Sequence, residues 1–163
     1  MLQRVAKAAA VASRAVAAVL SAVMAALITW VVYERFVQGT TPHWAEELPR
    51  FVMVWAAFVG GVVCSYDRSH LMAGLLPFVI RNARVLRAVE QLNHVLICVG
   101  MGALGWAGWQ LSLLTMDQML PAVDISAGLV YLALPVGSAL AIVVHLAQLL
   151  EQAPTQQATA PQK

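Results

Sequence analysis

Residues 15–32 read AVAAVLSAVMAALITWVV and contain no charged side chain. About 20 mostly apolar residues, rising 1.5 Å each, cross the hydrocarbon layer of a bilayer. The run continues to residue 37, where Glu34 and Arg35 mark its end. It is longer than the apolar core of a signal peptide, which has roughly 7–15 residues. We therefore predict an uncleaved transmembrane helix over residues 15–37.

The rest of the chain has the same character. Of its 163 residues, 61% are hydrophobic and only 11% are charged, whereas soluble domains carry about 25% charged residues. Further apolar runs that can span a membrane cover residues 48–66, 88–114 and 127–150. The sequence predicts an all-α integral membrane protein with four transmembrane helices, folded as one domain over residues 1–150.

Lysine and arginine indicate the orientation, because the loops that stay in the cytoplasm are enriched in both. The basic residues are, in chain order, Arg4, Lys7 and Arg14 before the first span, Arg35 and Arg50 in the first connection, Arg68, Arg81, Arg84 and Arg87 in the second, and Lys163 in the tail. Most of them lie on the side of the N-terminus. We therefore predict that both termini are cytoplasmic.

Two segments outside the spans have their own character. Residues 72–87, MAGLLPFVIRNARVLR, carry Arg81, Arg84 and Arg87 at intervals of three beside apolar residues. This pattern is typical of an amphipathic helix on an anionic membrane surface. Residues 151–163, EQAPTQQATAPQK, are rich in Gln, Pro, Thr and Ala. They predict a disordered cytoplasmic tail.

Small residues recur four apart in the second span, as Ala56, Gly60 and Cys64 and as Ala57, Gly61 and Ser65. Helices in lipid associate where small side chains let their backbones approach. The other spans also carry small residues, more than four helices need to pack together. A further membrane protein is therefore expected as a partner.

The second span opens with polar residues. Glu46 and Glu47 complement the positive end of the helix dipole, and Glu46 can pair with Arg50 four residues later. A capped helix start explains these residues, and a contact with a partner protein is the alternative.

The second span ends in residues 62–72, VVCSYDRSHLM, where Asp67, Arg68 and His70 interrupt the apolar run. A metal site made of Cys64, Asp67 and His70 would need convergent geometry, but these residues straddle the predicted end of a helix. The stretch is better explained as the exit of the chain from the membrane.

Ionisable residues inside spans are functional candidates by default. His94 and His145 lie at similar depth and could ligate a b-type haem, which would make the chain a cytochrome subunit. Glu90 is the candidate carboxylate of an independent proton-coupled transporter, but it lies near the end of its span. No hydrolase or phosphate-loop motif is present, and the net charge of +2 gives no indication of nucleic-acid binding.

Two stretches resemble one family. Residues 46–72, EELPRFVMVWAAFVGGVVCSYDRSHLM, and 117–140, DQMLPAVDISAGLVYLALPVGSAL, are similar to the small permease subunit of TRAP transporters, the DctQ-like family. The positions that carry the resemblance are Glu46 or Glu47, Arg50, Trp55, Gly60, Gly61, Arg68, His70 and Leu71, followed by Gln118, Pro121, Ala122, Ile125, Tyr131, Pro135 and Gly137. Ser126 stands where the family more often has Pro.

The resemblance implies a non-enzymatic scaffold subunit in the bacterial inner membrane, without a cofactor. It would pack against a large multi-spanning permease that holds the substrate and sodium sites. A periplasmic binding protein would deliver the substrate. The system would take up organic acids such as dicarboxylates or sialic acid, driven by a sodium gradient.

Overall fold

Four long apolar helices dominate the computed structural model, which describes residues 2–67 and 83–152. In chain order the elements are α1 (Leu2–Tyr33), the π-helix η1 (Glu34–Gln38), α2 (Glu47–Tyr66), α4 (Ala83–Leu114), β1 (Met119–Leu120), β2 (Ile125–Ser126), α5 (Ala127–Tyr131) and α6 (Ala133–Gln152). The segments long and apolar enough to cross a membrane are Gln3–Gln38, Glu47–Tyr66, Gln91–Leu114 and Ala127–Leu150. The prediction of four such helices is confirmed.

The first helix begins at Leu2, so residues 2–14 continue the predicted span 15–37 as one helix. Its basic residues end the apolar run but do not end the helix, since the surrounding alanines have high helix propensity. The first glycine after this start is Gly39, which has a left-handed φ of 71° and donates its N–H to the Glu34 carbonyl. The helical segment Gln3–Gln38 has 36 residues, or about 54 Å, and exceeds a hydrocarbon layer of about 30 Å.

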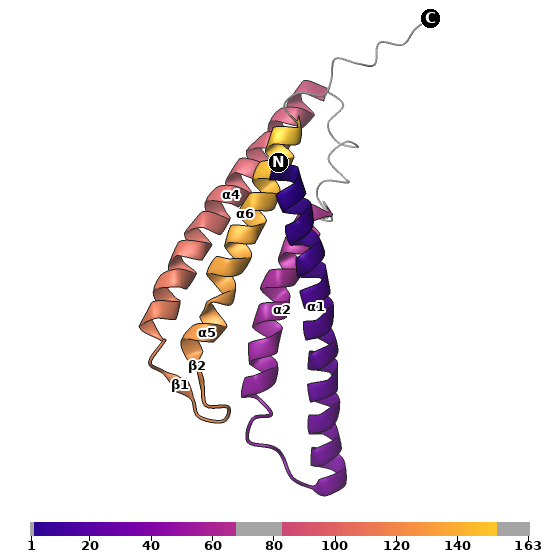
Figure 1. Cartoon of the computed structure of the whole chain (residues 1–163), viewed down its shortest axis with the longest axis vertical. Helices are drawn as coiled ribbons and strands as arrows, with labels where there is room; N and C mark the ends of the chain where they lie inside the picture. The colour runs from indigo at the N-terminus through magenta and orange to yellow at the C-terminus, as the bar shows by residue number, and fades with distance from the viewer. Residues whose placement is uncertain (1, 68–82, 153–163) are drawn as a thin grey trace, which may run out of the picture.

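The helices form two neighbouring pairs. Figure 1 shows α4 beside α6 and α1 beside α2, and α6 packs against all three other long helices. The buried core is small, and its main cluster consists of Ala6, Val62, Val144 and Ala147, with Tyr66 and Leu140 packed against it. In the most apolar window of α1 no residue is buried, whereas 33% are buried in the window that covers α5 and α6. Much apolar helix surface is therefore left for lipid or protein.

The connection between α4 and α5 is a β-hairpin that the all-α prediction missed. β1 and β2 pair antiparallel, with Met119 opposite Ser126 and Leu120 opposite Ile125. Ser126 then serves as the N-cap of α5, because its hydroxyl accepts a hydrogen bond from the Gly128 N–H and donates one to the Met116 carbonyl. Ser at this position, where the resembling family more often has Pro, thus has a structural role.

Two predicted segments fall largely outside the described residues. Of the predicted surface helix 72–87, residues 72–82 are not described, and residues 83–87 belong to α4 instead of a separate helix. Arg84 and Arg87 are therefore part of α4, and Arg81 lies outside the described range. Of the predicted tail, Glu151 and Gln152 continue α6, and residues 153–163 are not described.

Candidate functional site

The start of α2 is joined to the β1–β2 hairpin by Glu47. Its carboxylate Oε2 accepts a hydrogen bond from the backbone N–H of Ala122 at 2.9 Å, across 75 residues of sequence. Glu46 and Arg50 are exposed, and the predicted ion pair between them is wrong, since the ion pair found among the described residues joins Arg14 to Asp67. Glu47 thus holds the hairpin, while Glu46 and Arg50 remain available on the surface.

Trp55 links α2 to α5 inside the apolar region. Its indole Nε1 donates to the Leu129 carbonyl at 3.1 Å, in the last turn of the short helix that precedes α6. Hydrogen bonds between transmembrane helices contribute about 0.6 kcal/mol on average. Trp55 therefore makes a contact within this chain, in addition to any contact that it makes with a partner protein.

The glycines and the proline that carry the family resemblance fall into two groups, according to the space around them. A Cβ added at Gly137 would lie 2.8 Å from Phe58 Cβ, so α2 and α6 approach closely there. Pro135 contacts α4 in the same way, since its Cδ would lie 3.1 Å from a Cβ at Gly108. By contrast, a Cβ at Gly60 or Gly61 would meet no atom of the described residues within 4 Å. Pro135 and Gly137 thus pack the chain internally, whereas Gly60 and Gly61 face outward.

Small residues make up the later part of the exposed side of α2, after the exposed Met53. Ala57, Gly61 and Cys64 are exposed on this side, while Ser65 is buried at 7% exposure and donates back to the Gly61 carbonyl. Of the two predicted small-residue ridges, the one that included Ser65 therefore turns inward at its end. We define the open stripe of α2 as Ala57, Gly61 and Cys64.

The end of α2 is held by Asp67. Both of its carboxylate oxygens accept hydrogen bonds from Nη2 of Arg14 at 2.8 Å, which joins the N-terminal half of α1 to the end of α2. Because both side chains are well exposed, the pair adds little stability by itself. Arg68 and His70, predicted to fix this corner, lie outside the described residues. Asp67 is thus engaged by a cation of its own chain rather than aimed at a metal.

His94 and His145 do face each other. Their Nδ1 atoms are 3.0 Å apart, and their ring centroids are separated by 5.2 Å with a 55° tilt. His145 is buried on α6 at 2% exposure, and His94 on α4 is half-buried. Axial ligation would require an iron and its macrocycle between the two rings, which instead touch directly. The pair fits a hydrogen bond between α4 and α6 and does not fit a haem.

A second contact at the same end involves Gln148. Its amide Nε2 donates to the carbonyls of Ser65 and Tyr66 at 2.9 and 3.3 Å, in the last turn of α2. The last four carbonyls of a helix lack partners within the helix, so Gln148 of α6 closes the end of α2. With His145 one turn earlier, it places two buried polar contacts at one end of α6.

A protein-family model matches residues 24–155, which is most of the chain. Its description is the DctQ component of tripartite ATP-independent periplasmic transporters. The chain belongs to the DctQ family. No curated protein matches it. DctQ proteins are membrane components of a transporter and not enzymes, so the cytochrome and the independent proton-coupled transporter are set aside in favour of a TRAP subunit.

The DctQ match begins at Met24, inside α1, and runs through α2, α4 and α6. It therefore covers the β1–β2 hairpin, Trp55, the open stripe and the histidine pair. The first half of α1, with its three basic residues, lies before the matched range.

Three contacts of this DctQ chain were not found from its sequence, namely Arg14 with Asp67, Glu47 with Ala122 and Gln148 with the end of α2. One weak signal existed for the first. Arg14 precedes the first span and Asp67 follows the second, so an antiparallel pair of helices brings them to the same end. The other two contacts join a side chain to backbone groups, which sequence pattern does not reveal.

Proposed function

We propose that this DctQ component is the scaffold subunit of a large multi-spanning permease in sodium-driven uptake of organic acids such as dicarboxylates or sialic acid. The observation that carries the proposal is the open stripe of α2, where Gly61 leaves space that no described residue fills. Such small-residue surfaces allow close approach of another helix in lipid. The unburied apolar window of α1 offers further surface beside it.

The distribution of charge supports the same role. Residues 15–33, 51–66, 95–116 and 125–144 contain no Asp, Glu, Lys, Arg or His. A site that binds a carboxylate substrate or a sodium ion within the membrane needs charged or strongly polar groups. We assign the substrate and sodium sites to the large permease and leave this subunit a structural role.

Co-expression with the large permease tests the proposal. We expect the two subunits to co-purify through an affinity tag on this chain, and uptake of the organic acid by whole cells to depend on both. Normal uptake by the large permease in cells that lack this chain would contradict the scaffold role. Uptake in cells that express neither subunit supplies the background.

We further propose that both termini are cytoplasmic and that the hairpin after α4 faces the periplasm. The excess of arginine and lysine before α1 and between α2 and α4 supports this orientation. Asp117 and Asp124 are then exposed acids on the outer side, where the periplasmic binding protein docks to deliver substrate. Glu46 is exposed near the same end and belongs to the same proposed docking surface.

Cysteine labelling tests orientation and docking together. With Cys64 and Cys98 replaced by serine, Asp117→Cys should react with a membrane-impermeant maleimide in intact spheroplasts, and the binding protein should slow that reaction. Arg4→Cys, at the opposite end of the fold, should react only after permeabilisation. The reverse pattern of labelling would contradict the orientation, and an unchanged rate with binding protein would remove Asp117 from the docking surface.

A further inference from the structure

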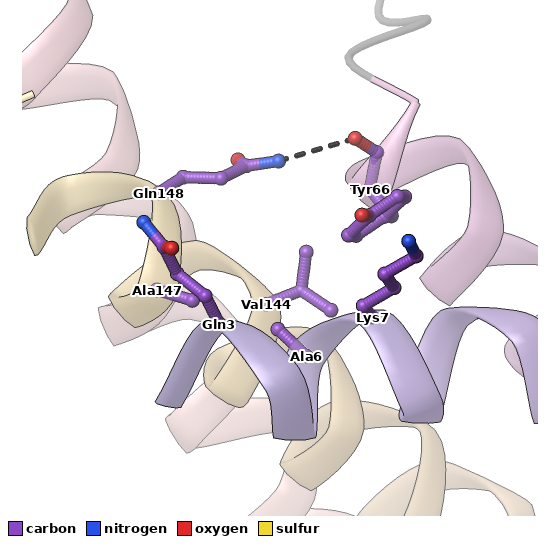
Figure 2. A pocket seen from close by; sticks show the side chains of 7 residues that line it. All are labelled: Gln3, Ala6, Lys7, Tyr66, Val144, Ala147 and Gln148. Carbon is purple, nitrogen blue, oxygen red and sulfur yellow. Dashed lines mark hydrogen bonds between the residues drawn. The ribbon is translucent and has the colours of Figure 1, made fainter. Parts of the chain in front are cut away.

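A cavity of about 200 Å³ lies where α1, α2 and α6 meet, at the end of the fold that carries the N-terminus. Figure 2 shows Gln3 and Lys7 rising from α1 on either side of Ala6, with Tyr66 beside Lys7 and Gln148 opposite. Ala6, Val144 and Ala147 are buried core residues and form an apolar floor. The cavity thus combines an apolar base with a polar rim.

The rim offers hydrogen-bond donors for which the described part of the chain supplies no acceptor. Within the described residues, the Lys7 ammonium, the Gln3 amide and the Tyr66 hydroxyl have no hydrogen-bond acceptor. Gln148 differs, because its amide nitrogen is already bound to the end of α2. The donors of the rim therefore favour a ligand that supplies several acceptor oxygens and a negative charge.

The charge of α1 is positive, as an anionic ligand requires. From Leu2 to Tyr33 the helix carries Arg4, Lys7 and Arg14 and no acidic residue. Asp67 neutralises Arg14 through both carboxylate oxygens, whereas Lys7 is in no ion pair among the described residues. Lys7 is thus the uncompensated cation at the cavity.

We propose that this cavity binds the phosphate of a membrane phospholipid through Lys7, Gln3 and Tyr66. The apolar floor distinguishes a lipid from a free phosphate ion, which would gain nothing from Ala6 and Val144. One turn beyond Lys7, on nearly the same side of α1, Val11 is 58% exposed. It provides apolar surface for an acyl chain beside the bound headgroup.

Native mass spectrometry of the full-length chain tests the proposal. The purified protein is stripped of lipid in detergent and titrated with palmitoyl-oleoyl phosphatidylglycerol. We expect one phospholipid to bind at low lipid concentration and Lys7→Gln to weaken that binding about tenfold, the weight of one charge-assisted hydrogen bond. Lys7 is exposed, so this substitution leaves the fold intact. Ala147→Leu, which fills the cavity from its floor, should also weaken binding.

Arg4→Gln is the matched control, because Arg4 has the same charge on the same helix but does not line the cavity. Binding unchanged in Arg4→Gln and reduced in Lys7→Gln supports the site. Equal weakening in both variants would indicate diffuse surface charge and overturn the proposal. Displacement of the lipid by inorganic phosphate in large molar excess would show a free-anion site and would also overturn it.

Discussion

Gly108→Leu is expected to separate α4 from α6 and to lower the free energy of unfolding by at least about 3 kcal/mol, near the upper end for overpacked cores. A Cβ at Gly108 would lie 3.1 Å from Pro135 Cδ and closer still to Leu134 Cβ. Leucine adds three more carbon atoms at a point where α6 cannot yield, because its other sides pack on α1 and α2. Circular dichroism during titration with sodium dodecyl sulfate measures the loss.

Gly102→Leu is the matched control for this experiment. Gly102 lies on the same helix, and a Cβ there would meet no atom of the described residues within 4 Å. Because leucine also has the higher helix propensity, Gly102→Leu should unfold at the same detergent fraction as the wild type or slightly later. A similar loss in both variants would show that glycine is needed for the helix itself rather than for the α4–α6 contact.

Gly61→Leu is expected to have the opposite outcome. The fold of this chain should be retained, and its binding to the large permease should be lost. Nothing in the described chain contacts a Cβ at this position, so circular dichroism should match that of the wild type. If the open stripe packs on the permease, leucine forces the two backbones apart at the contact. Loss of a central interface contact costs about 2 kcal/mol or more, which is at least tenfold in affinity.

Co-purification with the tagged chain measures this second effect. Gly61→Leu should recover at least about tenfold less permease than the wild type, by the same affinity argument. Gly102→Leu serves again as the control, since it adds the same side chain to an open position on α4. Full recovery of the permease with Gly61→Leu would exclude the open stripe as the contact surface and move the interface to another helix.

Hydropathy was enough to predict the four apolar helices, because a lipid solvent requires long apolar segments whatever they pack against. It predicted residues 48–66 for the second span, and α2 covers residues 47–66, so the bounds agree within one residue. For α1 it located the apolar span but not the start of the helix, since charge marks the end of the apolar layer and not the end of a helix. The β1–β2 hairpin was missed because strands of two residues leave no periodic pattern.

The contacts at the candidate site were less accessible to sequence reasoning. Gly60 and Gly137 look alike in sequence, and only the neighbouring helix determines that one is open and the other lies against Phe58. The similar depth of His94 and His145 was predictable from their places in adjacent spans. The direct contact of their rings was not, because it depends on how α4 and α6 are rotated about their axes.

The ion pair of Arg14 with Asp67 also bears on the order of events during synthesis. Asp67 follows Arg14 by 53 residues, so Arg14 emerges from the ribosome long before its partner exists. In the proposed orientation, its full positive charge favours a cytoplasmic position for the start of α1 during that interval. Once α2 is inserted, Asp67 pairs with Arg14 and cancels this charge. A residue that first directs insertion thereby becomes part of the contact between α1 and α2 in the finished fold.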